Sequence, residues 1–187
     1  MKMAGGKVPV GNYKRAAFDA YPTPEVATRI LLSRVKFEGS IWECASGKGD
    51  ISSVLEREFP GQVFSSDIQT GPDIYGVNGL DFLMTTGRTV DNILTNPPFS
   101  LAEQFIEHAL KIAQKKSAFL LRLAFLEGQR RYKLFTEHPP AKIIVISRRL
   151  PFCINGQWEK TGAVFGHAWM VFDKEHTGPT TIEWATY

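Results

Sequence analysis

The sequence has few of the residues that build disulfide-rich or metal-dependent folds. Its two cysteines, Cys44 and Cys153, provide neither a disulfide framework nor metal-ligand spacing. The histidines are scattered, at positions 108, 138, 167 and 176, so we expect no metal ion. No apolar run approaches the roughly 18 residues that span a bilayer, and the first 15 residues lack the apolar stretch of a secretory signal. We therefore expect a cytoplasmic protein without a membrane segment.

The chain also lacks anything that would divide it. It contains no internal repeat, low-complexity tract or Pro/Gly-rich linker, and 187 residues suffice for one domain with a substantial core. Residues 1–20 are polar and contain glycine. We therefore predict an N-terminal arm over residues 1–20 and a single domain over 21–187.

Basic residues are concentrated in the second half of the chain. Between Lys111 and Arg149, ten lysines and arginines stand against two acids, a net charge of +8, while the remainder carries −5. This asymmetry suits a polyanionic partner, and Arg130 and Arg131 are candidates for phosphate contacts. A solvated charged surface would give the same count, so charge alone leaves both interpretations open.

Segments typical of strands alternate with segments typical of helices. Helices are expected with Thr23 as N-cap and Pro24 as the first helical residue, and over residues 50–59, 101–116 and 129–137. The expected strands are 40–44, 63–66, 92–95, 117–121, 143–147 and 163–172. The alternation predicts an α/β doubly wound, mostly parallel sheet covered on both faces. Because no helix separates the last two strands, they predict an antiparallel hairpin at the sheet edge.

A glycine loop joins the first expected strand to its helix, with the sequence Glu43-Cys44-Ala45-Ser46-Gly47-Lys48-Gly49-Asp50. It departs from G-x-G-x-x-G and lacks the Lys-Ser/Thr pair of a P-loop. The next strand ends at Asp67, about 20 residues on, where an acid can accept hydrogen bonds from both ribose hydroxyls. A plain turn and a simple cap are the alternatives for the loop and the acid. Together the two features indicate a ligand that contains adenosine.

The most specific motif is Asn96-Pro97-Pro98-Phe99, directly after the strand at 92–95. Two prolines fix the backbone and remove two N–H donors, which leaves carbonyls as the main-chain polar groups. The Asn side chain adds an acceptor, so two rigid acceptors can bind both hydrogens of one amino group. That contact localises the nitrogen lone pair toward an electrophile, while the aromatic ring can stack on the planar group. An Asn-Pro turn followed by a core Phe is the alternative.

The order of these motifs resembles the amino-methyltransferases of DNA, and within them the N6-adenine group whose cofactor motifs precede the catalytic one. The resemblance spans roughly residues 20 to 172 and rests on Tyr21-Pro22-Thr23-Pro24, Glu43-x-Ala-x-Gly-x-Gly49, Asp67, Asp81-Phe82 and Asn96-Pro97-Pro98-Phe99. It implies a Rossmann-like class I methyltransferase fold with a seven-stranded, mostly parallel sheet and an antiparallel terminal strand. It also implies S-adenosylmethionine as the methyl donor.

The resemblance further implies a role for individual residues. The methionine end of the cofactor would contact Tyr21, Thr23, Glu43, Ala45 and Gly47. Asp67 would hold the ribose, Asp81 and Phe82 the adenine ring, and Ile68 belongs to the same cofactor set. In the catalytic motif, Asn96 and the Pro97 carbonyl would bind the target amine, with Pro98 fixing the turn and Phe99 stacked on the base.

The chain departs from these DNA enzymes in having little room for target recognition. Only residues 148–164 remain for it, with Phe152 and Trp158 as candidate stacking residues. Such short, stand-alone forms resemble phage and prophage methyltransferases. We expect a monomer that methylates adenine in nucleic acid, DNA before RNA, in a short or relaxed sequence context. RNA adenine, a protein glutamine amide and a non-catalytic cofactor-binding module are the alternatives.

Several residues outside these motifs also have expected positions. Arg122 and Glu127 follow the strand at 117–121 and are candidates for the edge of the cofactor or substrate cleft. Cys44 is expected to be a small core residue. Three aromatic residues near the C-terminus are expected to serve packing and not function: Trp169, Phe172 and Trp184.

Overall fold

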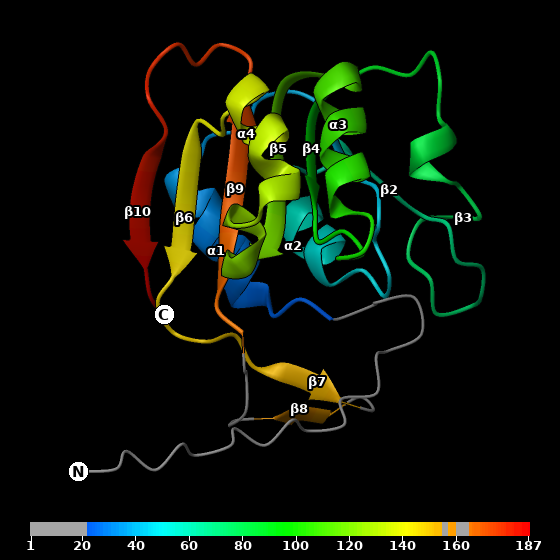
Figure 1. Ribbon diagram of the computed structural model, residues 1–187. Coiled ribbons are helices and arrows are strands. Elements are labelled where there is room, and N and C mark those ends of the chain that lie inside the picture. The colour runs from blue at the N-terminus through cyan, green and yellow to red at the C-terminus, as the bar shows by residue number, and fades with distance from the viewer. Residues whose placement is uncertain (1–21, 155–156, 160–164) are drawn as a thin grey trace.

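The computed structural model describes residues 22–154, 157–159 and 165–187, with the backbone alone at 152–154 and 157–159. Most of these residues form one eight-stranded sheet covered by helices (Figure 1). Across the sheet the strands are β10 (Thr181–Ala185), β6 (Lys142–Ile146), β9 (His167–Asp173), β5 (Ala113–Arg122), β4 (Val90–Thr95), β1 (Ile41–Glu43), β2 (Val63–Asp67) and β3 (Val77–Asn78).

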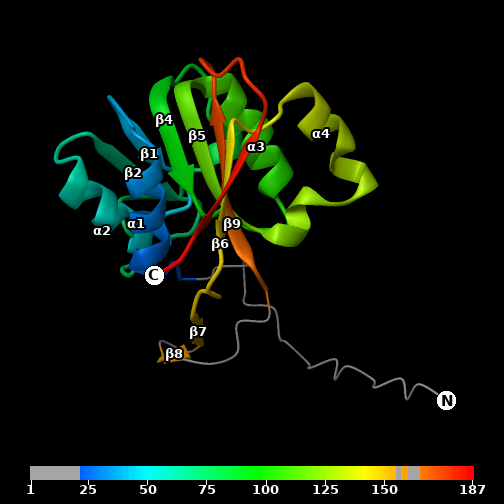
Figure 2. The ribbon, with the colours of Figure 1, turned by 90° about the vertical axis from the view of Figure 1, so that its left-hand side faces the viewer.

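Helices cover the two faces of this sheet. Helices α1 (Glu25–Arg34) and α2 (Asp50–Glu58) lie on one face, and α3 (Ala102–Ile112) and α4 (Tyr132–Glu137) lie on the other (Figure 2). Three short 3-10 helices complete the described elements: η2 (Phe82–Met84), η3 (Leu123–Leu126) and η4 (Gln129–Arg131). The predicted doubly wound α/β architecture is therefore confirmed.

Strand direction places the loops that matter for function at one edge. β9 runs antiparallel to both β5 and β6, whereas every other described pair in this sheet is parallel. Parallel strands end at the same edge, so the segments after β1, β2, β4 and β5 converge there. In open α/β sheets, ligands bind at this carboxyl edge.

The end of the chain differs from the sequence prediction. The last two expected strands do pair antiparallel, but they do not form the sheet edge, because β10 adds a strand beyond β6. This additional strand brings the sheet to eight strands instead of seven. Of the three aromatic residues expected to serve packing, Trp169 and Phe172 on β9 are buried, whereas Trp184 on β10 is 66% exposed.

Two helix predictions also require correction. The helix expected over 101–116 ends at Ile112, because Ala113 pairs with β4 and Lys116 pairs with both β4 and β9 in the first part of β5. Helix α1 begins at Glu25 with Pro24 as its N-cap, and no side chain caps it. Thr23 is not the cap, because its hydroxyl accepts a hydrogen bond from Asn96 instead.

The predicted recognition loop at 148–164 contains a small strand pair. β7 (Phe152–Ile154) and β8 (Gln157–Glu159) pair antiparallel as a separate two-stranded sheet. Figure 1 draws this pair beyond the carboxyl end of β6. The segment therefore belongs to the same end of the molecule as the loops after β1, β2 and β4.

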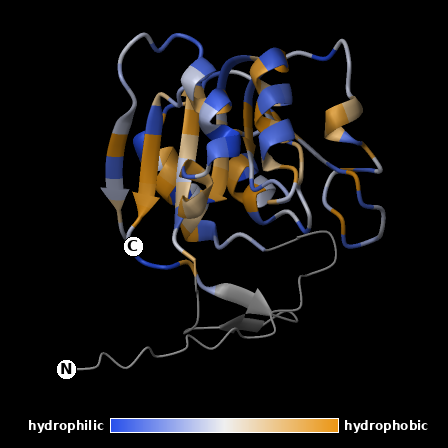
Figure 3. Cartoon of the chain, viewed as in Figure 1, coloured by the Kyte–Doolittle hydropathy of each residue, from blue (hydrophilic) through white to orange (hydrophobic). Residues whose placement is uncertain are grey.

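Buried apolar side chains form a cluster on each face of the sheet. One cluster joins α1 and α2 to the sheet, and there the Trp169 indole donates a hydrogen bond of 2.7 Å to the Ala27 carbonyl. The other lies under α3 and includes Trp42, Phe82 and Phe119. In Figure 3 the strands are largely hydrophobic, while much of α3 is hydrophilic. The polar side of this helix faces solvent, as expected for an amphipathic surface helix.

Candidate functional site

A cavity of about 880 Å³ lies at the carboxyl edge, between the loops that follow β1, β2 and β4. Its volume is within the range of small-molecule and cofactor sites. The lining residues from the predicted cofactor set are Thr23, Glu43, Ala45, Gly47, Asp67, Ile68, Asp81 and Phe82. These residues come from separate segments of the chain, and the fold brings them to one cavity. Tyr21, the remaining member of the set, lies outside the described residues.

The glycines let the loop after β1 turn tightly under this cavity. Gly47 and Gly49 have positive φ angles of 52° and 87°, a region that favours glycine. A Cβ atom at Gly49 would also approach the Tyr75 ring to 2.5 Å. The Gly47 carbonyl accepts a hydrogen bond from the Tyr75 N–H at 2.9 Å, which fixes the loop against the segment after β2.

Asp67 is a buried carboxylate at the end of β2. Oδ2 accepts from the Gly47 N–H and Oδ1 accepts from the Gln69 N–H, both at 2.8 Å. These bonds hold the carboxylate at the cavity wall. Each oxygen of an ionised carboxylate has more than one acceptor site, so Asp67 can also accept from ligand hydroxyls. The residue therefore shapes the glycine loop as well as facing the cavity.

Glu43 is fully buried at the end of β1. Oε1 accepts hydrogen bonds from the Thr95 hydroxyl at 2.5 Å and the Ala45 N–H at 3.2 Å. Oε2 is buried and has no hydrogen-bond partner among the described residues. Burial, as the largest cause, raises the pKa of Glu43 to about 8, and nearby Asp67 and Asp50 act in the same direction. A ligand cation beside Oε2 would favour the ionised form.

Asn96 connects the catalytic motif to the segment before α1. Its side-chain Nδ2 donates to the Thr23 hydroxyl at 3.0 Å, and the Thr23 N–H donates to Asp50 Oδ2 at 3.3 Å. This donation fixes the amide so that the acceptor Oδ1 is at its opposite end. Asn96 and Pro98 line the cavity. The Pro98 carbonyl accepts from the Leu101 N–H at 2.9 Å and so leads into α3.

Phe99 lies beside the cavity and is not among its lining residues. The Arg122 guanidinium carbon lies 4.3 Å from the Phe99 ring centroid, and the His167 ring lies 6.4 Å from it with an interplanar angle of 32°. The buried Pro97 is likewise absent from the lining. Asn96 and Pro98 of the motif therefore line the cavity, whereas Phe99 lies in a neighbouring region where β5 ends and β9 begins.

Asp81, Phe82 and Ile68 form another wall. Asp81 Oδ1 accepts from the Leu83 N–H at 2.9 Å and so caps η2. Phe82 is buried, with its ring centroid 5.2 Å from that of Trp42 in an edge-on arrangement. Ile68 is 55% exposed, although it lines the cavity. An exposed apolar side chain at the rim of a cavity is available to cover a bound ring.

Of the predicted substrate-binding residues, Arg130 and Arg131 have described side chains, and these two contact different partners. Arg130 is exposed and forms an ion pair of 3.3 Å with Glu103. Arg131 faces its own loop, where it donates to the carbonyls of Ala124, Phe125 and Glu127 at 3.4, 3.3 and 2.6 Å. Arg131 therefore stabilises the turn after β5. The side chains of Phe152 and Trp158 lie outside the described residues.

Sequence reasoning missed one contact that shapes the site. Asp50 was expected only to open α2, yet its carboxylate holds Thr23, far earlier in the chain. No local pattern signals such a contact. Cys44 is buried, as expected for a core residue, and burial raises its pKa. Within the part of the chain that the structure describes, no three His, Cys, Asp or Glu side chains are grouped to hold a metal ion.

The described fold is similar to those of several solved methyltransferases. An S-adenosylmethionine-dependent O-methyltransferase from Thermotoga maritima matches with a TM-score of 0.56 and 14% identity, over 83% of this chain and 67% of that one. A proposed RNA methyltransferase from Pyrococcus horikoshii matches with a TM-score of 0.58 and 13% identity, over 80% and 81%. A dimethyladenosine transferase from Plasmodium falciparum gives 0.55 and 13%, over 83% and 63%.

At these identities the likeness establishes the fold, and the predicted Rossmann-like class I methyltransferase fold is confirmed. No family model and no curated protein matches the sequence. Among the described residues, no helix is long and apolar enough to cross a membrane. Because a shared fold does not identify a reaction, the chemistry of this protein depends on the residues of the site.

Proposed function

We propose that this protein is an S-adenosylmethionine-dependent methyltransferase that acts on the exocyclic N6 amine of adenine in DNA. One observation carries the proposal. The cavity at the carboxyl edge gathers the glycine loop, Asp67, Asp81 and Phe82, and the Asn96 amide lies at its rim. An adenosine-binding wall and an amine-binding amide therefore share one cavity, as transfer between the two ligands requires.

The residues present suit this cofactor. Asp67 offers carboxylate oxygens for the ribose hydroxyls, and Phe82 and Ile68 offer apolar surface for the adenine ring. Glu43 offers a buried oxygen without a partner among the described residues, which suits the positive charge at the methionine end. When bound, S-adenosylmethionine would supply an electrophilic methyl carbon next to a sulfonium.

The chain's own residues would position the acceptor. Asn96, held by Thr23, would accept one hydrogen of the target amine, and the Pro97 carbonyl would accept the other. Both contacts localise the nitrogen lone pair, so that it points at the methyl carbon. As its bond to the methyl carbon formed and the carbon–sulfur bond broke, the nitrogen would become positively charged, and it would then lose a proton to water. Positioning supplies most of the rate, and no strong general base is required.

Three considerations support nucleic acid as the substrate. The segment from Lys111 to Arg149 carries a net charge of +8. The amine motif suits a planar exocyclic amine, with Phe99 available to stack. Proteins of similar fold include a proposed RNA methyltransferase and a dimethyladenosine transferase, and these favour RNA adenine as the second candidate. A duplex target would have to be flipped out of its stack.

The test is methyl transfer from tritiated cofactor to DNA, RNA and protein, followed by mass spectrometry of the nucleosides. We expect N6-methyl-2′-deoxyadenosine from DNA digests, and about a hundredfold less of it, or lower still, with Asn96→Ala. Label on RNA alone would establish the second candidate. Label on protein, or no transfer to any of the three, would contradict the proposed function.

A further inference from the structure

Arg122 lies next to the catalytic motif without belonging to the cofactor cavity. It is the last residue of β5 and stands opposite His167 of β9 in the antiparallel register. The neighbouring strand β4 leads into Asn96-Pro97-Pro98-Phe99. Arg122 is not among the cavity-lining residues, so it faces a different part of the carboxyl edge.

The Arg122 guanidinium lies over two aromatic rings. Its central carbon lies 4.3 Å from the Phe99 ring centroid and 4.0 Å from that of Phe165. The next residue, Leu123, donates its N–H to the Gly166 carbonyl at 2.9 Å, which anchors the start of the loop. Two rings at these distances restrict a planar guanidinium but leave its N–H edge available for in-plane contacts.

The positive charge of Arg122 is not balanced inside the described part of the chain. No described carboxylate lies within 4.0 Å of it, and its Nε is buried without a hydrogen-bond partner there. By contrast, Arg130 has Glu103, and Arg34 has Glu183. A partly buried cation without an anion is unfavourable. The site is therefore suited to an anion supplied by a ligand.

The surroundings of Arg122 support this interpretation. His167, opposite Arg122, has its pKa lowered to about 4, mainly by burial and further by the positive charge of Arg122. Its imidazole is therefore neutral at physiological pH and adds no cation to the pair. Arg88 provides a useful contrast, because it also stacks on two rings but is exposed and can be hydrated.

The position of Arg122 selects among anions. The cofactor carboxylate would lie in the cavity, which Arg122 does not line. The remaining ligand is the methyl acceptor, which the proposed function places against Asn96 and Phe99. In a polynucleotide, the anions next to a target base are its flanking phosphates, and a guanidinium edge matches phosphate oxygens.

We propose that Arg122, stacked on Phe99 and Phe165, binds a phosphodiester that flanks the target base, an inference that rests on the proposed polynucleotide substrate. Phosphate contact and base stacking would then be coupled through one side chain, since Arg122 also lies on Phe99. Arg122 is thus a positioning residue that directs the backbone of the substrate toward the amine site.

The test is binding of a single-stranded DNA oligonucleotide, measured by fluorescence anisotropy at several salt concentrations without cofactor. Arg122→Gln should weaken binding about tenfold at low salt and reduce the slope of log affinity against log salt by about one phosphate contact. Arg122→Lys keeps the charge and should keep the slope. Arg88→Gln removes an arginine stacked at the other end of β4 and should match the wild type. Circular dichroism and thermal melting check that each variant is folded.

Each other outcome contradicts the inference in a different way. A wild-type slope in Arg122→Gln, with affinity within about twofold, would show that Arg122 contacts no phosphate, although the protein still binds and methylates DNA. Equal losses in the Gln and Lys variants, with unchanged slopes, would show that Arg122 only supports the Phe99 ring. A wild-type protein that neither binds nor methylates polynucleotide would overturn the inference and the proposed function together.

Discussion

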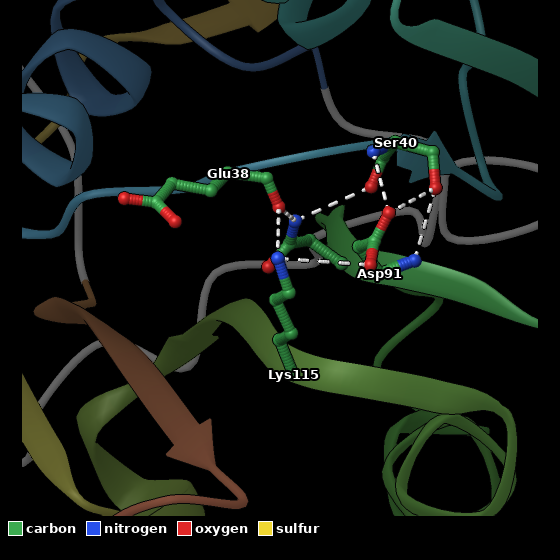
Figure 4. Close-up of polar contacts among 5 residues, drawn as sticks. Glu38, Ser40, Asp91 and Lys115 are labelled. Carbon is green, nitrogen blue, oxygen red and sulfur yellow. Dashed lines mark hydrogen bonds and ion pairs between the residues drawn. The ribbon is translucent and has the colours of Figure 1, made fainter.

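Polar side chains at the two ends of the sheet differ in how completely they are hydrogen-bonded. At the amino end, Asp91 Oδ2 accepts from the Ser40 N–H and hydroxyl, both at 2.9 Å, and the Asp91 N–H donates to the Ser40 hydroxyl (Figure 4). The Lys115 ammonium donates a hydrogen bond to the Glu38 carbonyl and forms an ion pair with Asp91. At the carboxyl end, Glu43 Oε2 and Arg122 Nε are buried without hydrogen-bond partners among the described residues.

The difference indicates which end serves stability and which serves ligands. The contacts in Figure 4 connect the start of β1 to β4 and β5. At the same end, Asn92 of β4 donates from Nδ2 to the Ser40 carbonyl, and its neutral amide oxygen Oδ1 is buried without a partner among the described residues. The corresponding groups at the carboxyl end belong to ionisable side chains, which cost far more to bury. Strain or desolvation that persists at one end of a fold is characteristic of a functional site.

The largest effect on methyl transfer is expected at Asn96. Asn96→Ala removes one acceptor for the target amine but leaves Asp67 and the glycine loop in place. Transfer should fall about a hundredfold or more, as when one preorganised transition-state hydrogen bond is removed. Cofactor affinity by calorimetry should change little. Asn78→Ala, at an exposed asparagine that donates to the Gly71 carbonyl, is the matched control. Near wild-type turnover in Asn96→Ala would rule out the amine contact.

A smaller effect is expected at Asp67. Asp67→Ala would remove the acceptors for Gly47 and Gln69 as well as for the ribose, so Asp67→Asn is the sharper variant. Its amide keeps one acceptor and places a donor against an N–H group. Charge-assisted hydrogen bonds contribute about 1.5–3 kcal/mol each, so cofactor should bind at least tenfold more weakly in calorimetry.

The control for Asp67 is Asp73→Asn, the same change at an exposed acid of the following loop that pairs with Lys48. It should bind cofactor like the wild type. Equal affinity in both variants would place the ribose away from Asp67.

Glu43 should make stability depend on pH. Burial raises its pKa to about 8, against an ordinary value of 4.5 in the unfolded chain. Between these values the folded state holds a proton that the unfolded state has lost. The free energy of unfolding therefore falls as pH rises through this window, by at most about 1.4 kcal/mol per pH unit.

Glu43→Gln keeps the shape of the side chain and removes this titration. In urea denaturation between pH 6 and 8, the wild type should lose at least about 1 kcal/mol relative to Glu43→Gln. His167, whose pKa is lowered to about 4, is present in both proteins, and its contribution cancels in the comparison. Parallel pH profiles would mean that Glu43 is ionised in the folded protein.

The sequence predicted the parts of this molecule that depend on short-range spacing. The glycine loop and Asn96-Pro97-Pro98-Phe99 follow strands and Asp67 ends one, and strand direction then places all three at one edge. The structure gathers the described members of the cofactor set at one cavity for this reason. Their chemical roles stay predictions.

The features that the sequence did not reveal arise from long-range pairing. Nothing local distinguishes β9 as an inserted strand or β10 as the sheet edge, because both positions depend on which distant backbone is available. The stacking of Arg122 likewise needs Phe99, which follows β4, and Phe165, which precedes β9. Residues 113–116 carry no helix-stop residue such as glycine or proline, so only their pairing with β4 and β9 ends α3.

The smallest effect on transfer is expected at the amino end, where a disruption should alter stability alone. Gly39 has a φ angle of +89°, and a Cβ atom there would overlap the Asp91 carboxylate that bonds Ser40. Gly61, in the turn before β2, has a φ angle of +74° with nothing within 4 Å of such an atom. Both alanine variants carry backbone strain, on the order of 1–3 kcal/mol, but only Gly39→Ala also displaces Asp91. Urea denaturation should therefore show a larger loss for Gly39→Ala than for Gly61→Ala, while the transfer rate of the folded fraction stays within about twofold of wild type in both. A large loss of transfer in folded Gly39→Ala would show that the amino end is coupled to the site. The conclusion that the amino end serves stability alone would then be wrong.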